Sequence, residues 1–266
     1  MNARQRPFEI QKSVIFALMM RELRGNYSRF KLGYLWAILE PVAMIGILSA
    51  IRLLRGSGPI EGIPFPLFFA SGIITYSFFS GTIRGGLGAV ESSMSLMGYQ
   101  RVKPIDPILS RIILNSIIGL MTLVIILTVM HWVGYHFTMK SISFVILPII
   151  LLTLFSTGIG IGAAMISPQI NEFKKVFPML LRPLFFASGI FFSVSSMPES
   201  VQKYMLWNPI TIAIEQVRYY LFEDYELLNG SLVRLSVLAL GSLVLGLTIY
   251  RRYRIKVVTT GTIKQT

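Results

Sequence analysis

Cysteine is absent from this chain of 266 residues, and histidine occurs only twice. Without cysteine, a disulfide framework, a thiolate metal site and a cysteine nucleophile are all excluded. Charged residues make up only 14% of the chain, whereas an average soluble domain has about a quarter. Because 53% of the residues are hydrophobic and the mean hydropathy is +0.66, the composition indicates one integral membrane domain.

A phosphate-binding loop is also missing from the sequence. Residues 81–88 are rich in glycine, but they lack the lysine that follows the last glycine of such a loop. Phosphate binding there needs both the backbone amides and that lysine. We therefore expect the chain to bind no cofactor and to hydrolyse no ATP by itself, so any ATP-driven role requires a separate ATPase subunit.

Six apolar stretches are long enough to cross a bilayer, which takes roughly 20 mostly apolar residues. They cover residues 33–51, 65–83, 108–132, 143–166, 176–194 and 232–250. With six crossings, 19 of the 25 Lys and Arg residues lie on the side of the chain ends. Positive residues are retained in the cytoplasm, so both termini are predicted to be cytoplasmic. This distribution explains the net charge of +13 without nucleic-acid binding.

The first 31 residues combine a short apolar run, residues 14–20, with basic residues on both sides. The run is too short to cross a membrane, and no small-residue cleavage site follows it, so it is not a cleaved signal. Such a pattern favours a helix in the cytoplasmic interface. A disordered tail is the alternative, but disordered segments seldom hold seven consecutive apolar residues. Residues 32–256 are predicted to form the transmembrane domain, and residues 257–266 a cytoplasmic tail.

Two connections carry structure of their own. Residues 91–103 are cytoplasmic and lie between glycines and prolines, which predicts a short separate helix. Residues 195–226 contain two mixed segments split by Asn208-Pro209, each too short to span, and we interpret them as an extracellular re-entrant hairpin. In the fourth span, Gly158, Gly160 and Gly162 allow close approach of another helix, either within the chain or between chains.

Two charges fall inside predicted spans, Glu40 in the first and Arg182 in the fifth. Both lie six or seven residues from the cytoplasmic end of their span, about 10 Å along a helix. A Glu40–Arg182 pair, within one subunit or across two, would offset the cost of burying each charge. Arg182 has two open interpretations: a cation that lines a path for an anionic polymer, or only the partner of Glu40.

Aromatic and basic side chains supply further candidates. Aromatic faces pack against sugar rings, although Trp and Tyr also anchor helices at the interface. The aromatic candidates for a polymer path are Tyr34, Trp36, Phe69 and Tyr76. A cytoplasmic basic ring either binds anionic headgroups or attracts an acidic polymer. Its members are Arg24, Arg29, Lys31, Arg101 and Lys103.

Four separated segments resemble a known family when they are taken in order. They are RFKLGYLWAILEP at 29–41, YQRVKPIDPILSR at 99–111, KVFPMLLRPLFF at 175–186, and Trp207-Asn208-Pro209 followed by Glu215. The pattern is similar to the membrane subunits of ABC-2 type exporters, in particular the permeases that export capsular polysaccharide in Gram-negative bacteria.

The resemblance implies an all-α polytopic membrane protein with the ABC-2, type V exporter-like fold. It implies a homodimer with two copies of an ATPase subunit that bind ATP and Mg²⁺, in the bacterial inner membrane. A coupling helix at residues 91–99 would dock the ATPase. Its candidate residues are Glu91, Ser92, Met94, Leu96 and Tyr99. An outer gate would include Trp207, Asn208, Pro209 and Glu215.

The expected function is therefore ATP-driven movement of a lipid-linked acidic polysaccharide from cytoplasm to periplasm. The resemblance further implies a periplasmic copolymerase and an outer-membrane channel as partners. One alternative is export of an O-antigen, a teichoic acid or a drug by the same architecture. Another is a polytopic enzyme acting on lipid-linked sugars, but the acidic residues Glu223, Asp224 and Glu226 have no companion histidine. A secondary transporter is disfavoured, because such proteins more often show inverted repeats and none is visible in this sequence.

Overall fold

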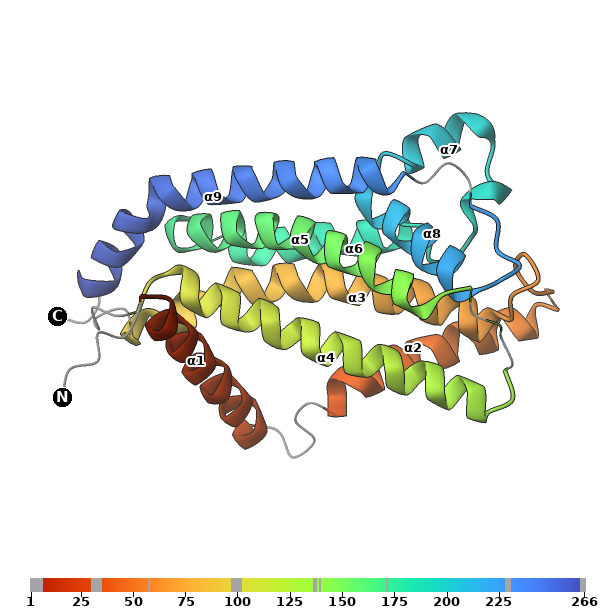
Figure 1. Ribbon diagram of the computed structural model, residues 1–266, viewed down its shortest axis with the longest axis horizontal. Coiled ribbons are helices and arrows are strands. Elements are labelled where there is room, and N and C mark those ends of the chain that lie inside the picture. The colour runs from red at the N-terminus through yellow and green to blue at the C-terminus, as the bar shows by residue number, and fades with distance from the viewer. Residues whose placement is uncertain are drawn as a thin grey trace.

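The protein is described by a computed structural model that covers residues 7–29, 35–56, 58–96, 102–135, 138, 140–170, 172–227 and 231–263. These residues form helices joined by short connections, and the described part of the chain contains no β-strand. The long helices run back and forth along one axis of the molecule (Figure 1). The beginning of α1 and the end of α9 lie at one end of this bundle, and α7 and α8 lie at the other (Figure 1).

The α-helices have the following bounds: α1 Pro7–Arg29, α2 Leu35–Leu54, α3 Phe65–Ala89, α4 Ile105–Trp132, α5 Ile142–Ile166, α6 Phe173–Phe186, α7 Glu199–Met205, α8 Pro209–Leu221 and α9 Leu232–Ile263. Three short 3-10 helices complete the order: η1 Glu91–Leu96, η2 Ser167–Gln169 and η3 Val194–Ser196. The centre of the bundle is α3, whose side chains are buried along nearly its whole length.

Four helices are long and apolar enough to cross a membrane: Phe65–Ala89, Ile105–Trp132, Ser143–Gln169 and Leu232–Val257. They coincide with the second, third, fourth and sixth stretches predicted from the sequence. The first stretch corresponds to α2, which begins at Leu35 and ends at Leu54. The count of six crossings, with both termini in the cytoplasm, stays a prediction.

The fifth stretch differs from its prediction. A helix was expected through residue 194, but α6 ends at Phe186 after only 14 residues. At 1.5 Å per residue this is about 21 Å, less than the roughly 30 Å of a hydrocarbon core. Pro178 and Pro183 remove two backbone donors from the helix. Beyond it the chain turns at Gly189, which has a φ of +73° that only glycine adopts readily.

The glycines of α5 serve contacts within the chain. A Cβ atom on Gly158 would lie 2.3 Å from the backbone of Ser242, and one on Gly246 would lie 2.2 Å from the Gly158 oxygen. On another side of α5, Gly160 lies against Gly86 of α3. The backbones of α5 and α9 therefore touch directly, as small residues permit between membrane helices. Of the two alternatives drawn from the sequence, the intramolecular one is correct.

We predict that Gly246→Val destabilises the folded chain, because the added side chain has to push α9 away from α5. Forcing extra atoms into a packed contact typically costs about 1–3 kcal/mol. The measurement is the thermal unfolding temperature of the detergent-solubilised protein. Gly241→Val is the matched control on the same helix, since no atom lies within 4 Å of its Cβ position. Equal unfolding temperatures for the two variants would contradict this account.

Candidate functional site

A buried guanidinium organises the end of the bundle where α8 lies. Arg218 has no exposed surface, and its guanidinium carbon lies 3.5 Å from the centre of the Phe68 ring. Its Nη1 donates to the Gly189 oxygen at 2.8 Å, and its Nη2 donates to the Ile190 oxygen at 3.1 Å. Both carbonyls belong to the irregular turn that follows α6. Arg218 therefore satisfies backbone groups that the early end of α6 leaves without helical partners.

The same side chain reaches α3. Its Nη2 also donates to the Phe68 oxygen at 3.3 Å, and its Nε to the Ser71 hydroxyl at 3.3 Å. One residue of α8 thus connects the first turns of α3 with the turn after α6. Since each contact is buried, loss of the donor would leave several acceptors unsatisfied at once.

Glu215 is the acidic member of this buried group. Its Oε1 accepts a hydrogen bond from the Tyr225 hydroxyl at 2.8 Å and lies 3.5 Å from Nη1 of Arg218. The carboxyl is only 1% exposed. Burial raises the pKa of Glu215 above its usual range, and the Arg218 charge and the Tyr225 hydrogen bond oppose this shift without cancelling it. We call Glu215, Arg218 and Tyr225, with Ser71 and Ser193, the outer cluster.

A chain of hydroxyls leads from the outer cluster to the surface. The Ser193 hydroxyl lies 3.1 Å from that of Tyr225 and 2.8 Å from that of Ser195. Ser195 in turn donates to the carboxylate of Glu61, in the connection between α2 and α3. Together with Glu61 and Ser195, the outer cluster therefore joins α3 and α8 to the connections that precede α3, follow α6 and follow α8.

The predicted outer-gate residues occupy two different environments. Trp207 is 66% exposed, and the Arg234 guanidinium lies 5.2 Å from its ring. Asn208 caps α8, because its side-chain oxygen accepts from the Ile210 amide at 3.0 Å, and Pro209 begins the helix. Glu215 instead points into the protein, where it holds α8 in place. The assignment of these residues to a gate stays a prediction.

Sequence reasoning missed the role of Arg218, which it counted only as one of the six cations on the side opposite the chain ends. The available signal was spacing: Glu215 and Arg218 are three residues apart in the largely apolar helix α8. Residues at that spacing lie on one helical face and pair. A pair of opposite charges on the apolar face of a short helix predicts a buried ion pair.

The charges Glu40 and Arg182 are both exposed in the isolated chain. Among the ion pairs formed by the described residues, none joins Glu40 to Arg182. The alternative of a pair within one subunit is therefore not realised. A pair between two subunits, and contact of Arg182 with a polymer, both stay open.

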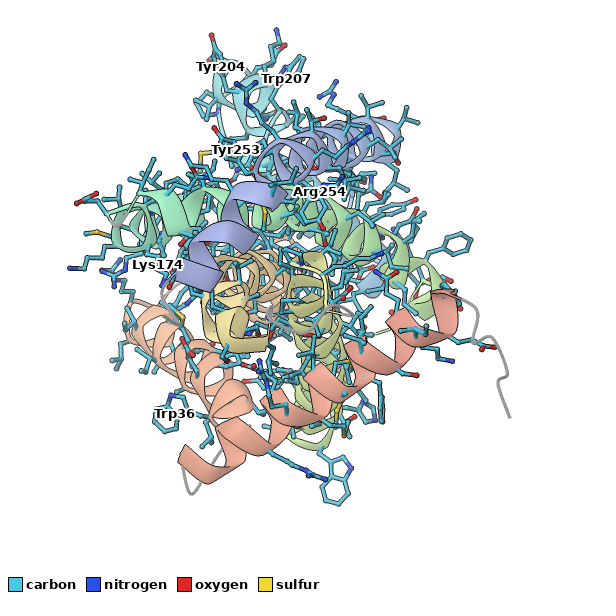
Figure 2. All side chains as sticks on the ribbon, turned by 90° about the vertical axis from the view of Figure 1, so that its left-hand side faces the viewer. Trp36, Lys174, Tyr204, Trp207, Tyr253 and Arg254 are labelled. Carbon is cyan, nitrogen blue, oxygen red and sulfur yellow. The ribbon has the colours of Figure 1, made fainter. Side chains whose placement is uncertain are left out.

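Two of the aromatic candidates are packing residues. Phe69 is 3% exposed and Tyr76 is 6% exposed. The Tyr76 ring lies 5.0 Å from that of Phe185, and its hydroxyl donates to the Leu181 oxygen, so it fastens α3 to α6. Phe69 packs against Phe191 in the turn after α6. The assignment of these two residues to a polymer path stays a prediction. Trp36 lies exposed at the edge of the bundle (Figure 2), and Tyr34 lies outside the described residues.

At the opposite end of the bundle, the predicted coupling segment begins as the 3-10 helix η1. Glu91 forms an ion pair with Lys174 of α6. The Ser92 hydroxyl accepts from Arg111 of α4 at 2.9 Å, and the Ser93 hydroxyl accepts from Arg21 of α1 at 2.7 Å. Met94 and Leu96 are half-buried. Tyr99 lies outside the described residues.

Neighbouring contacts tie α1 to α4. Arg111 also forms an ion pair with Glu22 at 2.9 Å. The buried Asp106 accepts from the side chain of Gln11 at 3.0 Å and from the Lys103 amide at 2.8 Å. Within the predicted basic ring, Arg24 and Lys103 are exposed. Lys31, Arg101 and the side chain of Arg29 lie outside the described residues.

Within the described residues, no group of three or more His, Cys, Asp or Glu side chains is placed to hold a metal ion. The arrangement is instead one of polar clusters at both ends of an apolar helical bundle. Long apolar helices and buried charges near their ends are typical of a polytopic membrane protein.

Comparison with known proteins identifies the class more closely. The model of the ABC-2 type transporter family matches residues 13–222, and the chain belongs to that family. It is 35% identical to the polysialic acid transport protein KpsM of Escherichia coli over 92% of this chain and 95% of that protein. The capsule polysaccharide export inner-membrane proteins BexB of Haemophilus influenzae and CtrC of Neisseria meningitidis are 24% and 26% identical, each over 92% of both chains.

We predict that Arg218→Met sharply lowers the amount of folded protein, because the carbonyls of Gly189 and Ile190 lose their donor. Each buried acceptor left unsatisfied costs about 1–3 kcal/mol. The yield of monodisperse protein after solubilisation measures the effect. Lys203→Met is the matched control, since Lys203 of α7 pairs only on an exposed surface, at 75% exposure. A normal yield for Arg218→Met would show that the outer cluster is dispensable for folding.

Proposed function

We propose that the chain is the membrane permease of an ABC exporter that moves capsular polysaccharide across the bacterial inner membrane. The observation that carries this proposal is the similarity to the polysialic acid transport protein over nearly the full length of both chains. That relative's cargo is an acidic polymer, which supports an acidic, lipid-linked polysaccharide here. The distribution of positive residues supports cytoplasmic termini.

The energy for export would come from outside the chain. We infer that two copies of an ATPase subunit, which bind ATP and Mg²⁺, dock against the segment from Glu91 to Tyr99. The position of η1 supports this, because it lies at the end of the bundle where α1 begins and α9 ends. A periplasmic copolymerase and an outer-membrane channel would complete the path to the cell surface.

The proposed transporter is a homodimer, and the exposed charges support this. A charge on the lipid-facing surface of a membrane helix costs at least about 2.5–3.5 kcal/mol. Glu40 of α2 and Arg182 of α6 both lie exposed in the single chain. A second copy that covers α2 and α6 would bring the two opposite charges together and remove them from lipid. We propose that Glu40 of each subunit pairs with Arg182 of the other.

A deletion of the gene for this chain tests the transport proposal. We expect the loss of surface capsule, with lipid-linked polysaccharide accumulating inside the cell, because synthesis continues while export stops. Immunodetection of the polysaccharide in intact and in lysed cells distinguishes the two pools. Plasmid-borne wild-type chain is the control and restores the capsule. Loss of O-antigen with an intact capsule would instead identify the other polysaccharide as the cargo.

Disulfide cross-linking tests the dimer proposal. Because the chain has no native cysteine, only the introduced cysteines can form a disulfide. Coexpressed Glu40→Cys and Arg182→Cys chains should form a disulfide-linked dimer under mild oxidation. A chain with Cys at position 233 is the control, because Val233 is an exposed residue of a different helix, α9. Monomers alone in the Glu40/Arg182 mixture would contradict the proposed interface.

Charge variants then separate the two roles of Arg182. If the residue only pairs, exchange of the charges, with Arg at 40 and Glu at 182, restores both the protein level and export relative to Glu40→Gln. If Arg182 contacts the polymer, the exchange restores the protein level but not export, because the cation has moved. Immunoblots of the permease beside surface polysaccharide measure both quantities. Normal values for all variants would remove both roles.

A further inference from the structure

The segment η1 is held by three separate elements of the chain. Arg21 of α1 reaches Ser93, Arg111 of α4 reaches Ser92, and Lys174 of α6 pairs with Glu91. Figure 2 looks onto this end of the bundle, where α1, the end of α9 and Lys174 lie. The predicted coupling segment is therefore not a free loop, because each of these contacts ties η1 to a different helix.

The contact with α6 differs in kind from the other two. The hydroxyls of Ser92 and Ser93 accept hydrogen bonds from cations that lie on α4 and α1. Glu91 and Lys174 instead carry full opposite charges, with side-chain exposures of 30% and 38%. A part-exposed pair contributes little to folding, about 0–1 kcal/mol. The pair still holds its two elements in register, because each charge follows the other at short range.

Through Lys174, the ion pair connects η1 to the helix that carries Arg182. Lys174 is the second residue of α6, and Arg182 lies eight residues further along the same helix. At 1.5 Å per residue, the two are about 12 Å apart along one short element. Both residues lie on one continuous helix, although Pro178 between them removes one backbone donor. That helix is the path by which a shift at Lys174 would reach Arg182. Further along α6, the Leu181 oxygen accepts from Tyr76 of α3, and the turn after the helix is held to α8 by Arg218.

We propose that the Glu91–Lys174 ion pair transmits movement of the coupling segment to α6 and so to Arg182, which makes Lys174 a positioning residue for export. This inference rests on the proposed function, because it requires an ATPase that acts on η1. Lys174 lies outside the coupling segment, 83 positions after Glu91 in the sequence. It also assigns the two other contacts of η1 to holding the segment rather than to transmission.

The test uses the complete exporter, with the ATPase subunit and lipid-linked polysaccharide, reconstituted in vesicles. We compare Lys174→Glu, Glu91→Lys and the double exchange for polysaccharide exported per ATP hydrolysed. Each single variant places like charges together and should lower this ratio at least about fivefold, the lower range of a measurable coupling between sites. The double exchange restores opposite charges and should recover the ratio. ATP hydrolysis and protein level should change little in Lys174→Glu, because Lys174 lies outside the docking segment and the pair adds little to folding.

Lys175→Glu is the matched control, since it makes the same charge change one residue away, on an exposed side chain. Its ratio should equal that of the wild type. An unchanged ratio in Lys174→Glu would overturn the proposal. A defect in both single variants that the double exchange fails to repair would also overturn it, because Glu91 would then act on the ATPase directly. Failure of the proposed function is distinguishable, since wild-type vesicles would then export no polysaccharide.

Discussion

A buried guanidinium needs acceptors for its donors, and Arg218 has two of them in the turn that follows α6. The turn after α6 leaves helical hydrogen bonding at Ala187 and exposes carbonyls to the interior of the bundle. In a helix-rich membrane protein, such backbone survives only when protein or water satisfies it. Arg218 does so for Gly189 and Ile190, and Glu215 and Tyr225 supply its polar surroundings. The hydrogen bonding of the turn after α6 and its contact with α8 therefore depend on the Arg218 side chain.

The two ends of the bundle are held by interactions of different strength. At the α8 end, contacts are fully buried, and the loss of one partner leaves a desolvated group behind, which is costly. At the η1 end, the ion pairs are partly exposed, between 19% and 38% of each side chain. Such pairs break and reform at little cost. The contacts of Arg218 therefore hold the α8 end more firmly than the partly exposed ion pairs hold the η1 end.

The sequence predicts the long helices well and their ends less well. Apolar length alone places α3, α4, α5 and α9, because membrane helices need a long apolar surface. It fails for α6, whose end is set by Gly189 and by Arg218, a donor 29 positions away in the chain. Phe69 and Tyr76 fit a polymer path and a packed core equally well by composition. The structure adds that both side chains are buried in the single chain, Tyr76 against Phe185 of α6 and Phe69 against Phe191.

Polar contacts between residues far apart in the sequence could not be predicted from sequence patterns. The Glu91–Lys174 and Arg21–Ser93 contacts join residues that share no motif and no periodicity. Glu40 and Arg182 were visible because a charge inside an apolar stretch is conspicuous. The structure adds that these two charges remain exposed in a single chain, whereas Arg218 and Glu215 do not. One pair of opposite charges is thus buried within the chain, and the other two charges lie on its surface. Helix α6 is common to these features, because it carries Arg182, pairs with η1 through Lys174 and leads into the turn whose carbonyls accept from Arg218.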